Sequence, residues 1–427
     1  MTYQKLKTLF LEMCNYNSIR NDIPANIYFH TFLGAYFRDT KISWGMSNKD
    51  LRVHPFWLQP SRTGKDQLNK VLNDVAISAG IKSVIITDIS SDASFIGTFD
   101  NYAHQYNTEN GLSKNAPSRK NKKGGMVTYK DPIIKGDLAN YQLIIISEGK
   151  LLFQTQSKKL LTILQPALDY PGIIRKKMKQ EEPIEYECTA SLVITSIPFK
   201  EISKSILDQG FFQRCALFIR RLSIEEIRQM RTEAKKLRNP NYKQKYLNAK
   251  IEFLQILNSL ENIPETLEVS DSAEEVLNKL QNNFIDEIST KVQGTDTMNA
   301  LSFTQTAEEI ALKMAGHIAI LEGSNKIHAK HVKKTYAVIY RIVDTILSEI
   351  EVEPDKAEYE DKRRLLNVIK GIIGTETYPL TDLTKKIADA FPFGISVARK
   401  KIDNLLQENH LVIELGDKNT KLIKVRK

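Results

Sequence analysis

Short apolar runs alternate with helical stretches over the first half of the chain. Five of these runs are rich in β-branched or aromatic residues and lie at 55–58, 83–89, 143–147, 191–197 and 215–222. Runs of about four to eight apolar residues are typical of strands buried on both faces of a parallel sheet. Four or five such strands separated by helices predict an α/β core with a parallel sheet over residues 49–222.

The regions on either side of this core predict helices. Residues 1–48 predict an N-terminal helical segment, and residues 223–352 predict a lid that is helical throughout, because apolar positions recur there at helical spacing. The acidic, proline-containing stretch 353–361 predicts a linker. Within the core, residues 107–125 are polar and rich in Gly, Asn and Lys, which predicts a flexible surface insertion.

The last part of the chain, residues 362–427, predicts a winged-helix domain. Helices are expected at 362–373, 380–391 and 396–409, followed by two strands around a Gly-Asp turn. Such a fold can place its third helix in the major groove of DNA while hairpin lysines contact phosphates, although winged helices also dock proteins. The cations expected to contact DNA are Arg399, Lys400, Lys401, Lys418 and Lys421.

Composition excludes several classes of protein. With 427 residues and 41% hydrophobic content, the chain can form two or three packed units. No apolar run approaches the roughly 20 residues that span a bilayer, and no signal-peptide pattern is present. The cysteines Cys14, Cys188 and Cys215 lie too far apart for a cysteine zinc site or a disulfide framework. We therefore expect a protein without a membrane partner in a reducing compartment, cytoplasmic or nucleoid-associated.

The charge balance favours a polyanionic partner. Lys and Arg outnumber Asp and Glu by 61 to 51, which gives a formal net charge of +10. Part of this surplus lies at 171–189, where two extended arms around a polar tip predict a β-hairpin. Cations there can follow a phosphate backbone without reading sequence, although a merely solvated basic hairpin is an alternative. The hairpin cations are Arg175, Lys176, Lys177 and Lys179.

A candidate phosphate-binding loop, QPSRTGKDQL at 59–68, follows the first strand and opens a helix. Such a loop needs backbone N–H groups at a helix N-terminus, a lysine for the β- and γ-phosphates and an oxygen ligand for Mg²⁺. Gln59 stands where the motif's first glycine is expected, and Asp66 where a serine or threonine would hold the metal. The predicted nucleotide-binding residues are Pro60, Ser61, Arg62, Thr63, Gly64, Lys65, Asp66 and Gln67.

A carboxylate at the end of a neighbouring strand completes this candidate site. An ATPase of this class needs acidic residues there to hold the metal and to polarise water, and Glu148 directly follows the run at 143–147. Glu148 is therefore the candidate base. Ser147 occupies the place of an expected aspartate, so we hypothesise that Asp66 replaces the missing carboxylate and shares Mg²⁺ with Glu148.

In this order, the motifs resemble the AAA+ core of minichromosome maintenance (MCM) type replicative helicases and related helicase-like ATPases of viruses and plasmids. Besides the phosphate loop, the resemblance is carried by SDASFIGT at 91–98, DLANYQLIIISE at 137–148, LQPALD at 164–169, VITSIP at 193–198 and FQRC at 212–215. It implies an AAA+ P-loop core in a viral or mobile-element member of the family. The N-terminal oligonucleotide-binding and zinc-bearing domain of cellular members is not expected in this chain.

The resemblance also implies roles for single residues. Arg214 is expected to reach the γ-phosphate bound to a neighbouring subunit, and the hairpin to point into the channel of a hexameric ring. Thr195 or Ser196 is expected to be the polar sensor, and the choice between them stays open because Ile197 occupies the best-aligned place. No arginine marks the expected sensor-2 helix, where Lys313 is the nearest cation.

These expectations converge on an ATP- and Mg²⁺-dependent, DNA-translocating AAA+ ATPase, a helicase of replication or of a mobile element. Its catalytic residues would be Lys65, Glu148 and Arg214, and its partners single-stranded or forked DNA and copies of itself. Two alternatives remain open. One is an origin-binding initiator ATPase that does not unwind DNA, and the other is a catalytically degenerate structural ring, because the expected motifs are eroded.

Overall fold

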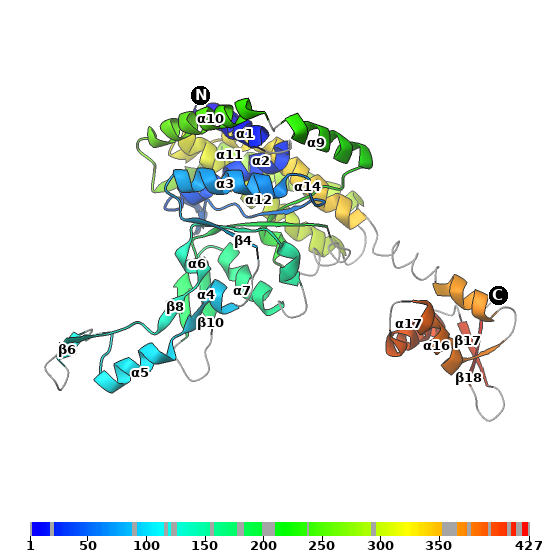
Figure 1. Cartoon of the computed structure of the whole chain (residues 1–427). Coiled ribbons are helices and arrows are strands. Elements are labelled where there is room, and N and C mark those ends of the chain that lie inside the picture. Colours follow the sequence, from blue (N-terminus) through cyan, green and yellow to red (C-terminus); the bar gives the residue numbers. More distant parts are fainter. Residues whose placement is uncertain are drawn as a thin grey trace. The chain divides into compact units, whose positions relative to one another are not determined.

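The chain forms two compact units, residues 1–351 and residues 352–427, each with its own hydrophobic core (Figure 1). The predicted linker at 353–361 lies outside the residues that the structure describes. In this computed structural model the described residues are 2–17, 21–87, 92–114, 118–120, 126–153, 158–176, 183–198, 210–236, 239–291, 296–351, 365–373, 377–391, 394–407, 411–415 and 421–425.

The first unit is built on a five-stranded parallel sheet, in the order β13-β3-β12-β9-β4. The five predicted runs form these five strands, so the predicted parallel α/β sheet is confirmed. All residues of β3, β9 and β12 are buried, which explains the apolar runs of β3 and β9 and the apolar centre of β12, whereas the edge strand β4 is only half-buried. The strands are β3 (Pro55–Leu58), β4 (Ser83–Ile86), β9 (Leu143–Ile146), β12 (Ser191–Ser196) and β13 (Ala216–Ile219).

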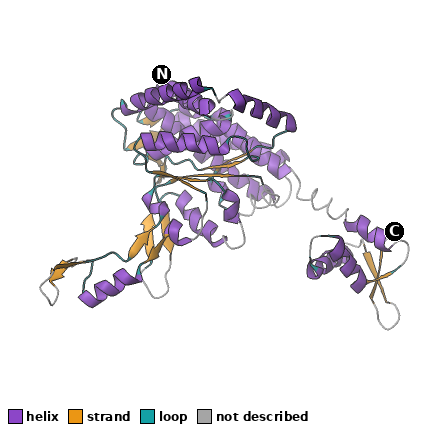
Figure 2. Ribbon diagram, viewed as in Figure 1, coloured by secondary structure: helices purple, strands orange, loops and turns teal. Residues whose placement is uncertain are grey.

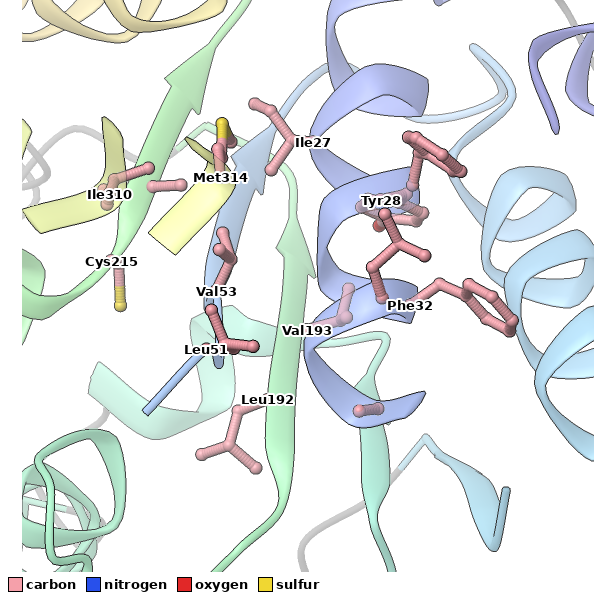
Figure 3. Packing of buried hydrophobic residues seen from close by; sticks show 14 of the residues in the cluster. Ile27, Tyr28, Phe32, Leu51, Val53, Leu192, Val193, Cys215, Ile310 and Met314 are labelled. Atoms are coloured by element: carbon pink, nitrogen blue, oxygen red, sulfur yellow. The ribbon is translucent and has the colours of Figure 1, made fainter. Parts of the chain in front are cut away.

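Helices cover both faces of this sheet. Figure 1 shows α1 (Thr2–Asn17), α2 (Asp22–Tyr36) and α3 (Lys65–Ser78) on one side, and α4 (Asp92–Ile96), α6 (Asp137–Asn140) and α7 (Lys158–Leu168) on the other. Helix α2 is the most enclosed of them, because every residue from Pro24 to Ala35 is buried. Figure 3 shows Tyr28 and Phe32 of α2 packed beside the strand that carries Val193.

The region after the sheet is largely helical, but not throughout. Strands β14 (Thr266–Val269) and β15 (Lys326–Ile327) join β1 (Lys41–Trp44) and β2 (Ser47–Asp50) in a second sheet, ordered β15-β14-β1-β2. The predictions of helices alone at 1–48 and at 223–352 are therefore wrong at these strands. Strands of two to four residues whose partners lie far away in sequence carry no local periodicity. The helices are α9 (Ile224–Lys236), α10 (Pro240–Asn258), α11 (Asp271–Lys291), α12 (Asp296–Leu321), α13 (Ala329–Lys333) and α14 (Tyr336–Glu351).

Two insertions extend from the parallel sheet, one between β4 and β9 and the other between β9 and β12. The first contains α5 (Asn101–Asn110) and two antiparallel pairs, so the described part of the predicted loop at 107–125 is partly ordered as helix and strand. The second is the predicted hairpin, which is confirmed, although its tip at 177–182 lies outside the described residues. The strands are β5 (Gly97–Phe99), β6 (Ser118–Lys120), β7 (Met126–Thr128), β8 (Ile133–Lys135), β10 (Ile173–Lys176) and β11 (Ile184–Glu187). Short 3-10 turns lie at Gly149–Phe153 and Phe212–Arg214.

The described residues of the second unit form helices and a small antiparallel sheet (Figure 2). Residues 365–373 are helical, and the helices and the hairpin occur in the predicted order. A short strand that was not predicted, β16, pairs with β18 and forms one edge of the sheet. Leu383, Ile402 and Ile423 belong to the core that joins helices to sheet. The other elements are β16 (Tyr378–Pro379), α16 (Leu380–Ala390), α17 (Ile395–Gln407), β17 (Leu411–Leu415) and β18 (Lys421–Val425). Among the described residues, no helix combines the length and the apolar character needed to cross a bilayer.

A buried histidine pair joins α2 to α12. The Nδ1 atoms of His30 and His317 lie 3.1 Å apart, and burial lowers the pKa of both rings, that of His317 to about 3. Between pH 6.5 and the folded pKa values, the unfolded chain binds protons that these rings do not accept, so stability falls as the pH falls.

We therefore expect the free energy of unfolding to decrease between pH 7 and pH 5, by up to about 1.4 kcal/mol per pH unit for each such histidine. Urea denaturation at pH 7, 6 and 5 measures this slope. His317→Gln should flatten it by about one histidine's share, whereas replacement of the exposed His104 should leave it unchanged. An unaltered slope in His317→Gln would show that the pair does not carry the effect.

Candidate nucleotide-binding site

A cavity of about 400 Å³ lies at the carboxyl ends of β3, β9 and β12. Ligands of open parallel sheets bind at this edge, because loops from several strands meet there. The cavity brings together the predicted phosphate loop and the predicted acidic residue, and it adds one residue from α9. It is lined by Ser61, Arg62, Gly64, Lys65, Asp66, Gln67, Ser147, Glu148, Ser196, Ile197 and Ala234.

The phosphate loop ends at the start of α3. Gly64 precedes the helix with a φ of 97°, a left-handed conformation that glycine adopts without steric cost. Helix α3 begins at Lys65, so the first-turn N–H groups, which have no acceptor within the helix, lie in the wall of the cavity. This arrangement is suited to an anion such as phosphate.

Gln59, which replaces the first glycine of the motif, organises the loop from below. Its side chain is fully buried, accepts a hydrogen bond from Trp57 Nε1 at 3.1 Å, and donates to the side chain of Asn21 at 3.1 Å and to the Thr63 carbonyl at 3.1 Å. Asn21 also donates to the Thr63 carbonyl, at 3.0 Å. Sequence reasoning missed Asn21, because it lies 38 positions before Gln59 and outside any motif.

Lys65 is buried beneath the loop with only 7% of its surface exposed. Its ammonium group donates to the carbonyl oxygens of Pro60, at 2.8 Å, and of Gln59. Burial lowers the pKa of Lys65, while the carboxylates of Asp66 and Glu148 act in the opposite direction. A phosphate would therefore compete with loop carbonyls for this ammonium group.

The two carboxylates of the site, Asp66 and Glu148, are exposed into the cavity from α3 and from the end of β9. Two carboxylates together with nucleotide oxygens and waters fit Mg²⁺, which is rarely enclosed by protein ligands alone. Across the part of the chain that the structure describes, no three His, Cys, Asp or Glu side chains converge to hold a metal by themselves. Asp66 and Glu148 alone would leave a bound Mg²⁺ dependent on oxygen ligands from outside the protein.

The two candidate sensor residues point in different directions. Thr195 is fully buried and accepts a hydrogen bond from Asn69 Nδ2 at 3.1 Å, and it is not among the residues that line the cavity. Ser196 lines the cavity and accepts from the Lys150 N–H at 3.0 Å. The geometry favours Ser196 as the residue that faces a ligand in the cavity, whereas Thr195 connects β12 to α3 through its bond with Asn69.

Pro60 and Thr63 also lie outside the residues that line the cavity. The Pro60 carbonyl accepts from Lys65 and, at 2.5 Å, from the Thr63 hydroxyl. These two predicted contact residues therefore shape the loop, and the geometry does not place their side chains against a ligand.

Arg214 lies away from the cavity of its own chain. Its Nε donates to Asp169 Oδ1 at 2.6 Å and its Nη1 to the Gly210 carbonyl at 2.6 Å, and about a third of its side chain is exposed. Lys313 is buried on α12 in ion pairs with Asp50 and Glu309, so it does not face the phosphate loop. Within one chain, neither Arg214 nor Lys313 lines the cavity that contains Lys65.

The predicted DNA-contacting residues occupy two separate surfaces. On the hairpin, Arg175 pairs with Glu185 across the strands at 3.0 Å, and Lys176 donates to the Gly97 carbonyl at 3.0 Å. In the second unit, Arg399 pairs with Asp403 along α17 at 3.1 Å. Lys400 and Lys421 are exposed, and Lys401 lies half-buried on α17. Lys177, Lys179 and Lys418 lie outside the described residues.

A scan against protein-family models gives no match, and a search of curated proteins gives none either.

Proposed function

We propose that this chain is an ATP-driven, DNA-translocating AAA+ protein, a DNA helicase of replication or of a mobile element. The observation that carries the proposal is the convergence of Lys65, Asp66 and Glu148 on one cavity, at the carboxyl ends of a parallel sheet. A strand, a lysine-bearing loop and a helix in succession form the phosphate-binding unit of P-loop NTPases. The lysine and the two carboxylates then supply the charges that phosphoryl transfer to water requires.

Four residues of the cavity have roles in this proposal: Lys65, Asp66, Glu148 and Ser196. Lys65 binds the β- and γ-phosphates, Asp66 and Glu148 hold Mg²⁺, and Glu148 also accepts a proton from the attacking water. Mg²⁺, when bound, would neutralise charge on the phosphate oxygens. Ser196 would lie near the transferred group, because it lines the same cavity.

A ring of copies, expected to be a hexamer, would bring Arg214 to the nucleotide of the neighbouring subunit. Its position outside its own cavity is consistent with action on a partner's nucleotide, since a planar, permanently charged guanidinium stabilises charge on a transferring phosphoryl group. The hairpin β10–β11 would then carry its cations along DNA. The second unit would add a duplex contact, and its succession of helices and terminal hairpin supports a winged helix.

Steady-state ATP hydrolysis with Mg²⁺, in the presence and absence of single-stranded DNA, is the first test. Stimulation by DNA, together with strand displacement of a forked duplex, would support the helicase. Hydrolysis and duplex binding without displacement would favour the origin-binding initiator instead.

A catalytically degenerate ring is the second candidate, and two observations favour it. The Lys65 ammonium group is already engaged by loop carbonyls, and Ser147 lines the cavity where a carboxylate is expected. Absence of ATP turnover with and without DNA would refute the enzyme and leave this structural role.

The hydrogen bonds of Gln59 lead to a prediction that opposes the motif. Restoring the expected glycine, Gln59→Gly, should weaken ATP binding by about tenfold or more, because it removes the amide that holds Asn21 and the loop carbonyl. Ser61→Gly adds the same backbone freedom to the loop without touching these bonds, so it should weaken binding less. Titration of a fluorescent ATP analogue compares the variants, and equal or tighter binding by Gln59→Gly would contradict the role given to Gln59.

Asp66 provides a separate test of the metal site. If Asp66 replaces the carboxylate that Ser147 lacks, Asp66→Ala should abolish most of the Mg²⁺ dependence of nucleotide binding. Titrations of the ATP analogue with and without Mg²⁺ measure it. A Mg²⁺ dependence equal to that of the unaltered protein would show that the compensation does not occur.

A further inference from the structure

A single buried side chain holds both ends of the β10–β11 hairpin. Arg52 Nη1 lies 3.0 Å from the carbonyl oxygen of Ala167, 2.8 Å from that of Cys188 and 3.2 Å from that of Ala190. Its Nη2 donates to the carbonyl of Asp169 at 2.7 Å. Two of these acceptors precede the hairpin and two follow it, so one guanidinium group joins the two feet of the hairpin, residues 167–172 and 188–190.

The feet are also pressed together by the backbone. The Cys188 N–H donates to the Gly172 carbonyl at 2.7 Å, and a Cβ atom on Gly172 would come within 2.6 Å of the Cys188 oxygen. The two feet are therefore joined to each other by the backbone as well as by Arg52.

The charge of Arg52 is balanced by Asp50, at the end of β2, and Asp50 in turn contacts the lid helix α12. Arg52 Nε pairs with Asp50 Oδ2, and Asp50 Oδ1 lies 3.2 Å from the ammonium group of Lys313 on α12. Lys313 in turn pairs with Glu309 at 3.0 Å. Leu51 and Val53, which alternate with these polar residues, belong to the same hydrophobic core as α12 (Figure 3), and Leu51 packs against Gly316 of that helix.

Asp169 connects Arg52 to Arg214, the arginine proposed to act on the nucleotide of a neighbouring subunit. Asp169 accepts from Arg52 through its carbonyl oxygen and from Arg214 through its carboxylate, at 2.6 Å. One residue thus separates the two arginines. The polar connection runs from α12 through Asp50 and Arg52 to the hairpin base, and from there to Arg214.

We propose that Arg52 is a positioning residue that couples the lid helix α12 and Arg214 to the DNA-contacting hairpin. The inference rests on the proposed function, because it assigns Arg52 the transmission of nucleotide-dependent movement to DNA. Arginine suits this position, since its planar group presents five donors in a fixed fork, whereas lysine has three donors at a single nitrogen. Arg52→Lys therefore keeps the buried charge beside Asp50 and loses most of the hydrogen bonds to the four carbonyl oxygens.

Hydrogen exchange of the full chain, followed by mass spectrometry, tests whether Arg52 holds the feet of the hairpin. In Arg52→Lys, peptides covering 167–176 and 184–190 should exchange about tenfold faster, while α3 keeps its original rates. Arg38→Lys, the same substitution at a more exposed arginine, should change neither region. Unchanged exchange at the feet would overturn the proposal.

A second variant guards against general destabilisation. If exchange in Arg52→Lys rises throughout the chain, the double variant Asp50→Asn with Arg52→Met removes both members of the Arg52–Asp50 pair and leaves Lys313 paired with Glu309. Folded proteins often tolerate the replacement of both members of a buried ion pair. Faster exchange confined to the feet in this double variant would support the proposal. Uniform or absent change would overturn it.

ATP hydrolysis tests the coupling separately from the proposed function. In Arg52→Lys, stimulation by single-stranded DNA should be lost, with the KM for ATP within about twofold of the original value. If the unaltered protein shows DNA-stimulated hydrolysis and the variant retains it, the coupling is refuted while the function stands. If the unaltered protein hydrolyses no ATP, the proposed function fails, and the exchange measurement alone decides whether Arg52 clamps the hairpin.

Discussion

Replacement of Lys65 by alanine is expected to reduce ATP hydrolysis by about 100-fold or more. Lys65 carries the ammonium group beneath the phosphate loop, and its charge lies close enough to the carboxylates of Asp66 and Glu148 for both to influence its pKa. Without that charge, the loop would no longer offset the negative charge that develops on the phosphates, while the two carboxylates would still repel them. Steady-state release of phosphate with Mg²⁺ and saturating single-stranded DNA measures the effect.

Lys70→Ala provides the matched control for this substitution. Lys70 lies on the same helix, α3, but is exposed and does not line the cavity. It should hydrolyse ATP at the rate of the unaltered protein. If Lys65→Ala retained most of the activity, the cavity would not be the hydrolytic site.

The largest effect on stability is expected from Asp50→Asn, which removes one charge without changing the size of the side chain. Asp50 is 3% exposed and faces two buried cations, Arg52 and Lys313. Removing one member of a buried ionic cluster leaves charge uncompensated in a medium of low dielectric constant, which costs about 3 to 5 kcal/mol. Urea unfolding followed by tryptophan fluorescence reports on this unit, because Trp44 and Trp57 both lie in it.

The pH dependence of this loss identifies its origin. Burial alone would raise the pKa of Asp50, but Lys313 and Arg52 outweigh burial and hold it well below its usual range. The stabilisation by this carboxylate is therefore present above the unfolded pKa and is lost as the pH falls through the folded pKa. The difference between Asp50→Asn and the unaltered protein should shrink once the pH falls below about 4.

The control for Asp50 is an exposed ion pair of the same unit. Glu252 pairs with Lys5 at 2.7 Å, with about half of each side chain exposed. Glu252→Gln should change the free energy of unfolding by less than about 1 kcal/mol. A comparable loss in both variants would mean that burial of the Asp50 cluster is not the cause.

The parallel sheet and the cavity could be predicted because their signals are local. A strand buried on both faces is mostly apolar, so β3, β9 and the centre of β12 stand out in the sequence. Parallel strands end at the same edge, so a lysine after one of them and Glu148 after another were expected to meet. Both lie in the same cavity.

The features that escaped prediction depend on partners distant in sequence. The pairing of β1 with β14 joins Lys41 to Thr266, and strands this short have no period of their own. The same is true of Asn21 beneath the phosphate loop and of Arg52 at the hairpin base. Asn21 is bonded to Gln59, 38 positions away, and Arg52 to Ala190, 138 positions away, and no spacing rule connects such partners.

The enclosure of α2 has a consequence during synthesis. Its apolar residues are covered partly by α12, and the adjoining β1 pairs with β14, so neither can be completed until the chain has grown beyond Thr266. At translation rates of about 5 to 20 residues per second, an emerging α2 would wait roughly 10 to 50 seconds for these partners. A largely apolar helix that stays exposed for that time is expected to bind chaperones, so the yield of folded protein should depend on them more than its final stability suggests.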